Sequence, residues 1–328
     1  MKILYAIQGT GNGHLCRAMD VIPCLQEFGE VDVLISGIQA DIILPFEIKY
    51  RLHGLSFIFG KSGGVDLWKT FMSSTVRKLI QEVNSVPVED YDLVINDFEP
   101  ITAWACHTKD IPCIGLSHQI GALHPESPKP EEADMMGKFI MKNYAPVTDA
   151  YGFHFKQYHS SIFTPVIRES IRNLEPTNNG HYTVYLPSYD DAHLLKHLTK
   201  FTDVQWEVFS KHNNKELKFK NVKIHPINNE QFVKSMASSH GVLCGAGFET
   251  PAEALFLKKK VLAIPMKNQY EQHLNAAALE DMGVPIIKSL KKKYEYDIEV
   301  WLNSNKTVEV NYPNNTMQIV EKIINKYR

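Results

Sequence analysis

Short apolar runs alternate with segments of helical periodicity along the first 172 residues. The apolar runs predict strands, at residues 2–7, 30–36, 91–97 and 111–117. Segments whose apolar residues recur every three or four positions predict helices, at residues 16–28, 75–83, 101–109 and 135–144. Strands that are apolar throughout and are separated by helices are typical of a parallel sheet with helices on both faces. We therefore expect β-α-β units in this part of the chain.

A second series of the same kind follows residues 173–180, where turn-forming residues predict a linker. Its predicted strands are residues 181–187, 204–210, 222–227, 241–245 and 261–266. Its predicted helices are residues 191–201, 229–239, 250–260 and 270–283. We predict an α/β fold of two Rossmann-like, doubly wound domains, at residues 1–172 and 181–312, and a last helix within residues 313–328. In such folds ligands bind beyond the carboxyl ends of the parallel strands.

The composition of the chain excludes several classes of protein. Hydrophobic residues make up 44% of the chain and charged residues 22%, and the net charge of −2 gives no general attraction to nucleic acid. The five cysteines show no metal-binding or disulfide spacing, which favours a cytoplasmic location without a structural metal. The first apolar run is too short for a secretory signal, and none reaches the roughly 18 residues of a membrane span. Peripheral contact with the inner face of a membrane stays compatible with this pattern.

The segment QGTGNGHLCR, residues 8–17, joins the first predicted strand to the first predicted helix. Gly11, Asn12 and Gly13 suit a tight turn that brings the backbone close to a ligand. The segment is a poor dinucleotide-binding fingerprint, because His14 stands where the third glycine would be. An imidazole directly after a glycine turn is presented to the cleft, so we predict that His14 is a general base.

Asp97 is the candidate partner of that histidine, because it closes the predicted strand at residues 91–97. A carboxylate on the second ring nitrogen would fix the tautomer and stabilise the imidazolium. Two alternatives stay open: Asp97 only caps the helix that starts near Pro100, or Glu99 takes the same role. His118 follows the next strand and faces the same edge, which predicts a residue of the acceptor site.

The segment GAGFETPAEA, residues 245–254, resembles the first site in its chemistry. Its glycines allow a sharp turn, and the backbone amides that follow lie at a helix N-terminus, where a phosphate group binds favourably. The residues that we expect to form this pocket are Gly247, Phe248, Glu249 and Thr250.

Three side chains near this turn suit sugar hydroxyls. Glu253 lies inside the helix and could accept hydrogen bonds from two ribose hydroxyls, or it could only interact with the helix dipole. Glu271 and Gln272 open the next helix and offer acceptors and one amide donor. Glu-Gln pairs are common on exposed helices, so the prediction rests on the spacing between this pair and Glu253.

These motifs resemble the donor site of GT-B nucleotide-sugar glycosyltransferases. The resemblance rests on Gly247, Thr250, Glu253-Ala254-Leu255, Pro265 and Glu271-Gln272-x-x-Asn275-Ala276. The nearest patterns are those of UDP-glucuronosyl and UDP-glucosyl transferases, antibiotic glycosyltransferases and the peptidoglycan GlcNAc transferase, and the glycine loop with its histidine agrees with them. The resemblance implies two domains that face each other, with the acceptor on the first and a UDP-sugar on the second. It also implies that the last helix returns to the first domain.

The resemblance assigns roles as well. It implies that His14, assisted by Asp97, deprotonates an acceptor hydroxyl for inverting attack on the anomeric carbon, without a cofactor or an obligatory metal. The ribose would lie on Glu253, and the transferred sugar on Glu271 and Gln272. The nucleotide base would bond the backbone of Ile227, and Ser188 would approach the phosphates. A cell-envelope or small hydrophobic molecule would serve as the acceptor.

Two positions depart from the family pattern. Many members have a histidine where this chain has Gly245, and a small residue where it has Glu249. A carboxylate so close to the phosphates is unfavourable unless it turns away or binds another group.

Two other functions remain open at this point, a UDP-sugar 2-epimerase and a nucleotide-sugar-binding protein without catalysis. The epimerase would need more acid-base carboxylates in the cleft. Residues 57–71, where aromatic residues alternate with glycines, are either a lid over the acceptor or a surface loop.

Overall fold

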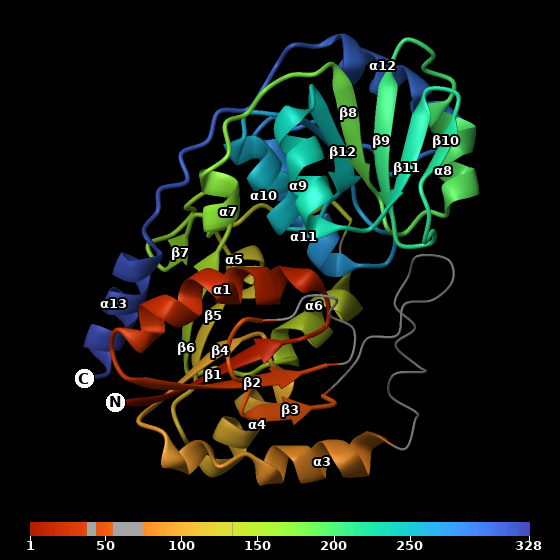
Figure 1. Ribbon diagram of the computed structural model, residues 1–328. Coiled ribbons are helices and arrows are strands. Elements are labelled where there is room, and N and C mark those ends of the chain that lie inside the picture. Colours follow the sequence, from red (N-terminus) through yellow and green to blue (C-terminus); the bar gives the residue numbers. More distant parts are fainter. Residues whose placement is uncertain (38–43, 55–74, 133) are drawn as a thin grey trace.

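The computed structural model describes residues 1–37, 44–54, 75–132 and 134–328. The predicted lid or loop at residues 57–71 lies outside them. Two mainly parallel sheets lie one above the other in Figure 1, each with helices on both faces. The predicted α/β fold is therefore confirmed. No helix in the described residues is both long enough and apolar enough to cross a membrane.

The first sheet occupies the lower half of Figure 1. Its strands are β1 (Lys2–Gln8), β2 (Glu30–Ser36), β3 (Tyr50–Leu52), β4 (Leu93–Asp97), β5 (Ile114–Ser117), β6 (Asp149–Phe153) and β7 (Ile162–Phe163). They are ordered β3-β2-β1-β4-β5-β6-β7, and every neighbouring pair is parallel. The helices of this half are α1 (Asn12–Gln26), α3 (Thr75–Ser85), α4 (Pro100–Lys109), α5 (His118–Leu123), α6 (Met135–Asn143) and α7 (Glu169–Arg172), with a 3-10 turn at Val88–Asp90.

Alternation along β1 explains how this sheet is covered. Ile3, Tyr5 and Ile7 pack in one cluster with the apolar residues of α1, whereas Leu4 and Ala6 pack with those of α4 on the opposite face. Since neighbouring side chains of a strand point to opposite faces, a fully apolar strand needs a helix on each side. Helix α1 starts at Asn12 rather than residue 16, directly after Gly11, whose φ of 94° suits glycine.

The second sheet forms the upper half of the molecule in Figure 1. Its strands are β8 (His181–Tyr185), β9 (Gln205–Ser210), β10 (Leu217–Phe219), β11 (Val222–Pro226), β12 (Gly241–Gly245) and β13 (Lys260–Ile264). They are ordered β10-β11-β9-β8-β12-β13, and only the edge strand β10 is antiparallel to its neighbour. The helices are α8 (Asp191–Leu198), α9 (Asn229–Ser238), α10 (Glu249–Phe256), α11 (Tyr270–Asp281), α12 (Glu295–Asn303) and α13 (Thr316–Lys326), with a 3-10 turn at Lys292–Tyr294.

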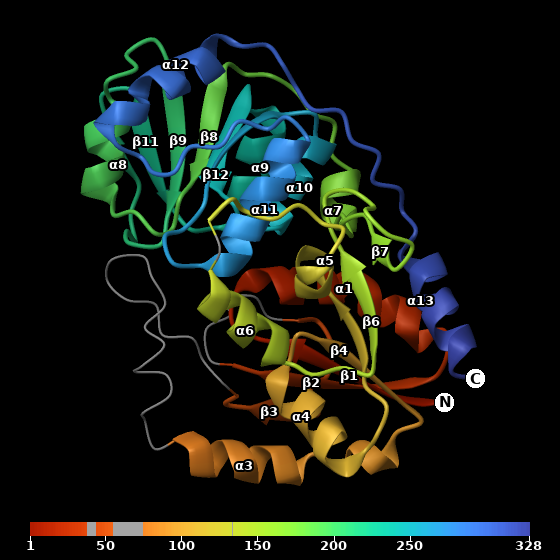
Figure 2. The same ribbon diagram turned by 180° about the vertical axis from the view of Figure 1, so that it is seen from behind.

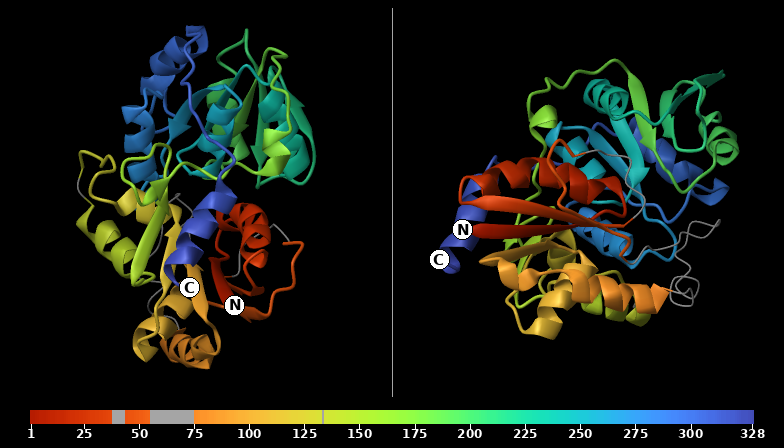
Figure 3. Two further views of the ribbon diagram at one scale, coloured as in Figure 1. Left: turned by 90° about the vertical axis from the view of Figure 1, so that its left-hand side faces the viewer. Right: turned by 60° about the horizontal axis from the view of Figure 1, so that its bottom comes forward.

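Helix α13 does not pack on the second sheet. The chain returns to the first half, where α13 lies beside α1 near the N-terminus (Figure 3). Ile319 and Ile323 of α13 are buried in one cluster with Ile22 and Leu25 of α1. The same cluster continues into the second half and includes residues of α10 and β12. The two halves thus share a continuous apolar core.

Candidate active site

A cavity of about 410 Å³ is lined by residues from β1, α1, α5 and α6 of the first half and by the start of α11 and the residues before it in the second. Figure 2 shows α5, α6 and α11 next to one another. The volume of the cavity falls in the range of cavities that bind small molecules. The first half contributes His14 and Gln119 to its lining, and the second contributes Glu271. Apolar lining residues include Phe98, Met136, Ile140 and Met141. The cavity therefore combines a few polar side chains from both halves with a largely apolar wall.

His14, in the first turn of α1, is held by Asp97 at the end of β4. Nδ1 of His14 lies 2.8 Å from Oδ1 of Asp97. Two acceptors would repel each other at this distance, so in the neutral imidazole Nδ1 carries the proton and donates it to the carboxylate. Nε2 is left as the acceptor, and the amide of Gln119 donates to it at 3.3 Å. Nη2 of Arg17 also lies 3.1 Å from Nδ1, so Asp97, at the shorter distance, is the partner of a protonated Nδ1. This tautomer leaves the basic nitrogen that a general base needs.

Asp97 is fully buried, and two cationic or cation-forming groups hold it. Nη2 of Arg17 lies 2.9 Å from both of its oxygens, and Nε of Arg17 lies 3.1 Å from Oδ2. Burial raises the pKa of the Asp97 carboxyl, but Arg17 and His14 outweigh burial and lower the pKa below its ordinary value. Asp97 therefore stays ionised beside His14.

Arg17 is a site residue that the sequence did not reveal. It is only 3% exposed, and its Nη1 donates at 2.8 Å to Oε1 of Glu249 in the second half. One guanidinium thus connects the partner of His14 to the start of α10. Its spacing was the available signal, because residues three apart share one face of a helix and Arg17 follows His14 by three.

Glu249, which departs from the family pattern, binds another group, namely Arg17. Its carboxylate also lies against the glycine turn, since a Cβ atom on Gly13 would stand 2.4 Å from Oε2 of Glu249. Only glycine fits at position 13 without displacing this carboxylate. Gly11 and Asn12 precede it in the turn and at the start of α1.

The predicted phosphate pocket lies at the start of α10. The residue before this helix, Phe248, provides no side-chain cap. A Cβ atom on Gly247 would meet no atom of the described residues within 4 Å. Thr250 is half-buried in the first turn of α10. Within the described residues the space on the Cβ side of Gly247 is therefore open.

Phe248 turns its ring toward the first half. The ring stacks on His118 with 3.8 Å between the ring centres. Nε2 of His118 lies 2.7 Å from Oδ1 of Asn275, and its Nδ1 lies 3.1 Å from the carbonyl of Phe153. Burial, with smaller contributions from His154 and Arg17, lowers the pKa of His118 well below its ordinary value. His118, predicted as an acceptor residue, lies in the contact between the halves and not in the cavity lining.

Glu253 is buried and bonded on both oxygens. Nε and Nη2 of Arg168, which directly precedes α7, donate to it at 2.6 and 2.8 Å. Burial raises the pKa of the Glu253 carboxyl although Arg168 opposes this effect. A ribose bound here would have to displace a buried ion pair, so this geometry gives the predicted ribose contact no support. Arg168 gave no signal in the sequence.

Glu271 and Gln272, at the start of α11, lie in different environments. Glu271 lines the cavity, and Nε2 of Gln119 donates to its Oε2 at 3.2 Å. Burial raises the pKa of the Glu271 carboxyl. Oε1 of Gln272 instead accepts from the amide of Met266 at 2.9 Å and holds the loop after β13. Only Glu271 of this pair faces the cavity.

The remaining predicted residues lie farther along the second sheet. Ser188 is half-buried in the turn between β8 and α8, and Ile227 follows β11 with 36% of its surface exposed. Neither lines the cavity. Glu99, and not Asp97, caps α4, because it accepts from the amides of Ile101 and Thr102 at 2.7 Å.

Comparison with known proteins gives a family match and a set of similar folds. The sequence matches the family described as glycosyl transferase family 1 over residues 1–304. No curated protein matches the chain.

Solved structures that resemble this one include LpCGTa in complex with UDP, at 12% sequence identity and a TM-score of 0.62, with 99% of each chain covered. MurG of Acinetobacter baumannii has 12% identity and a TM-score of 0.56, over 99% of this chain and 98% of MurG. UGT89C1 of Arabidopsis thaliana, complexed with quercetin, has 11% identity and a TM-score of 0.60, over 99% of this chain and 94% of that one. At such identities the likeness concerns the fold, which agrees with the GT-B architecture expected from the motifs.

Proposed function

The chain belongs to glycosyl transferase family 1, and from that premise we propose an inverting, metal-independent transfer of a sugar from a nucleotide donor, UDP-linked, to a hydroxyl group. The observation that carries this proposal is the contact of 2.8 Å between His14 and Asp97 at the cavity wall. In the described lining, His14 is the imidazole with a carboxylate behind it, and its basic nitrogen Nε2 has the long bond of 3.3 Å from Gln119.

In this mechanism Nε2 of His14 takes the proton of the acceptor hydroxyl. The oxygen then attacks the anomeric carbon from the side opposite the leaving nucleotide, so the configuration inverts. Asp97 stabilises the imidazolium that forms, and Arg17 keeps Asp97 ionised and in place. The general base contributes roughly 10²–10⁴-fold to the rate in such reactions.

The diphosphate would bind the backbone amides of residues 247–250. The positive end of the α10 dipole and these amides would stabilise the charge of the leaving group, which is the task of a metal ion in other transferases. The open space at Gly247 supports this placement. LpCGTa and UGT89C1 of Arabidopsis thaliana both form complexes with UDP, which favours a UDP-linked donor.

Glu249 would compete with the donor for this region. Its carboxylate lies between the start of α10 and the glycine turn at Gly13, and Arg17 compensates its charge. Two phosphate groups nearby would repel it, so donor binding would weaken its contact with Arg17. The guanidinium could then turn to the donor.

The apolar wall favours an acceptor with an apolar body. Phe98, Met136 and Ile140 would contact that body while its hydroxyl reaches His14. Glu271, on the opposite wall, would accept a hydrogen bond from the transferred sugar.

A 2-epimerase receives less support. Such an enzyme would need several acid-base carboxylates, and the carboxylates in the described lining of the cavity are those of Asp134 and Glu271. The family match also favours transfer. A protein that only binds the donor would have no use for the pairing of His14 with Asp97.

A ligand screen tests the proposal. Thermal unfolding is measured with UDP, dTDP and GDP and with their sugars, because a ligand at 100 times its dissociation constant stabilises the folded state by roughly 2.7 kcal/mol. Donor hydrolysis is followed in parallel by release of the nucleotide, with and without EDTA. Stabilisation by UDP and EDTA-resistant hydrolysis are expected. Stabilisation by none of the nucleotides would contradict the proposed donor, and loss of hydrolysis in EDTA would contradict metal independence.

A further inference from the structure

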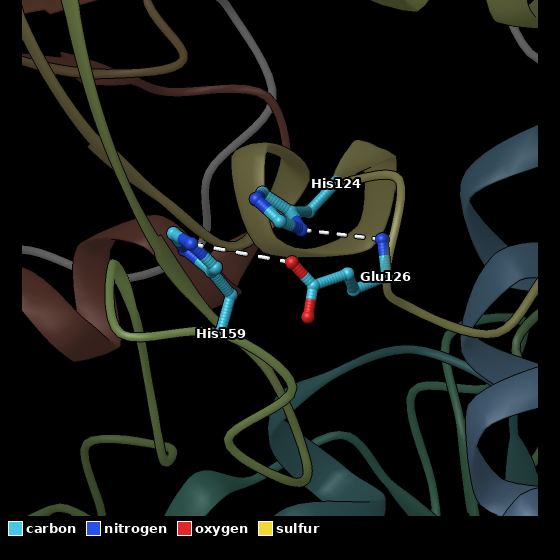
Figure 4. A group of neighbouring side chains, drawn as sticks. All are labelled: His124, Glu126 and His159. Carbon is cyan, nitrogen blue, oxygen red and sulfur yellow. Dashed lines mark hydrogen bonds and ion pairs between the residues drawn. The ribbon is translucent and has the colours of Figure 1, made fainter.

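Three side chains outside the cavity converge at the surface, namely His124, Glu126 and His159 (Figure 4). We call them the His-Glu-His cluster. One ligand atom from each lies within 4.8 Å of those of the other two. His124 and Glu126 follow α5, and His159 lies in the connection between β6 and β7. Segments that are distant in the sequence thus bring two imidazoles and a carboxylate to one place.

The first of these segments is held firmly. The ammonium group of Lys129 donates to three backbone carbonyls, those of Ala122, His124 and Ser127. The hydroxyl of Ser127 donates to the carbonyl of Gly121 at 2.6 Å. These bonds fix the backbone on both sides of Glu126, so the first two side chains start from a preorganised loop.

The ring of His159 is oriented by Ser161. Nδ1 of His159 lies 2.9 Å from Oγ of Ser161, which leaves Nε2 at 4.0 Å from Oε1 of Glu126. The amide of Ser161 also donates to Nδ1 at 3.2 Å, so a metal ion on Nε2 would require Nδ1 to give up this bond and donate its proton to the hydroxyl oxygen instead. The rings of His124 and His159 are 4.5 Å apart between centres. The amide of Glu126 donates to Nδ1 of His124 at 3.3 Å, a long bond that a stronger ligand would replace.

The charges around the cluster suit a cation in part. Glu126 supplies one negative charge. Lys129 opposes a cation, although three carbonyls share its charge.

We propose that His124, Glu126 and His159 bind a divalent transition metal ion, and that Zn²⁺ fits best. Two imidazoles and a carboxylate with a fourth position open to water form a common ligand set of zinc. Tetrahedral zinc places two ligand atoms roughly 3.3 Å apart, so the side chains must close further. Glu126 and His159 have 59% and 39% of their side-chain surfaces exposed, which leaves room for this movement.

The ion would connect the loop after α5 to the β6–β7 connection. None of its ligands lines the cavity, so the ion would stabilise the fold around α5 and take no part in the transfer. Helix α5 carries Gln119, which contacts both His14 and Glu271. The proposal is therefore independent of the proposed reaction, which needs no metal.

The experiment titrates tag-free, EDTA-treated protein with Zn²⁺ and with Mg²⁺ by calorimetry, and measures thermal unfolding in parallel. One Zn²⁺ per chain, a higher unfolding temperature and no Mg²⁺ binding are expected. The variants His159→Ala and Glu126→Gln should each weaken zinc binding at least tenfold. Both positions are exposed, so these variants should unfold like the metal-free parent.

His53→Ala is the matched control. His53 pairs with Glu82 at 3.2 Å, is 59% exposed, and in the described residues has no third potential ligand beside it. This variant should bind Zn²⁺ like the parent. The proposal is overturned if Zn²⁺ does not bind, or if His159→Ala binds it as the parent does. Loss of binding in His53→Ala alone would place the ion elsewhere and would also overturn it.

Discussion

Helices α1 and α10 begin alike but present different surfaces to the space between them. Each follows a strand through a glycine-containing turn, and neither has a side-chain cap from its N-cap residue. At α1 the carboxylate of Glu249 lies against Gly13, and Arg17 binds that carboxylate. At α10 the space beside Gly247 stays open within the described part of the chain.

The difference shows how one local motif serves two purposes. Helix α1 carries its reactive groups as side chains, since His14 and Arg17 both contact Asp97. Helix α10 offers its backbone, and its two acidic side chains, Glu249 and Glu253, bind arginines of the other half. We infer that α1 contributes chemistry and α10 contributes binding, and each of the following predictions tests one part of that division.

The largest expected effect is on turnover when α1 loses its base. His14→Ala should lower kcat by roughly 10²–10⁴-fold and leave nucleotide binding within about twofold of the parent, because the donor amides belong to α10. Turnover is measured with saturating donor, and binding by calorimetry with UDP. The exposed His107 provides the control variant His107→Ala. Unchanged turnover in His14→Ala would remove His14 from the mechanism.

The converse effect is expected when the open space at α10 is filled. Gly247→Val places a branched side chain where the diphosphate would lie, and we expect the dissociation constant of UDP to rise at least tenfold, about 1.4 kcal/mol. The unfolding temperature without ligand should change little, because a Cβ atom at this position meets no atom of the described residues within 4 Å. Unchanged UDP affinity would show that the phosphates bind elsewhere.

A smaller effect is expected from the carboxylate between the helices. Glu249→Gln removes a negative charge near the phosphates and releases Arg17, so UDP should bind about three- to tenfold more tightly. Glu280→Gln at the exposed far end of α11 changes the net charge equally and is the control. Calorimetry at two salt concentrations measures both variants. Weaker binding in Glu249→Gln would mean that Glu249 assists the donor.

The last prediction concerns stability and not turnover or binding, and it tests the aromatic contact that holds Phe248 before α10. His154 is buried near this ring without a hydrogen-bond partner in the described residues, and burial lowers its pKa to about 3. Below pH 6.5 His154 binds a proton in the unfolded chain but stays unprotonated in the folded state. The free energy of unfolding should therefore fall with decreasing pH between about 6.5 and 3, by up to about 1.4 kcal/mol per pH unit from this group.

His154→Phe keeps an aromatic side chain and removes the proton site. Its free energy of unfolding, measured by urea denaturation at pH 7.5, 6 and 5, should decline less steeply than that of the parent. His118 is buried with a lowered pKa as well, so part of the slope should remain. The same slope in both proteins would contradict the buried, neutral state of His154.

The sequence predicted the fold because its signals are local. Fully apolar strands and the helices between them define both sheets, and the glycine turn marks the start of α1. The proximity of His14 and Asp97 could also be predicted, since the ends of adjacent parallel strands lie side by side. Asp97 and Glu99 were both candidates for the partner of His14. Glu99 does not take that role, because its carboxylate accepts hydrogen bonds from the amides at the start of α4.

What the sequence could not predict depends on contacts between distant residues. Arg17 and Glu249 are 232 positions apart, and Arg168 and Glu253 are 85 apart. Glu253 was expected at a ribose because its position in the motif is typical, yet its charge is matched by an arginine of another segment. The burial of His118 under Phe248 has the same origin, since it arises only when the two halves meet.

The return of α13 to α1 has a practical consequence for handling this protein. The outer cover of the helix that bears His14 comes from the last residues of the chain, through Ile319 and Ile323. Trimming those residues, or crowding them with a fused partner, would expose the apolar face of α1 around Ile22 and Leu25, on the helix that positions His14. Activity lost in such a shortened protein would report damage to that support, even though no atom of α13 lies at the cavity.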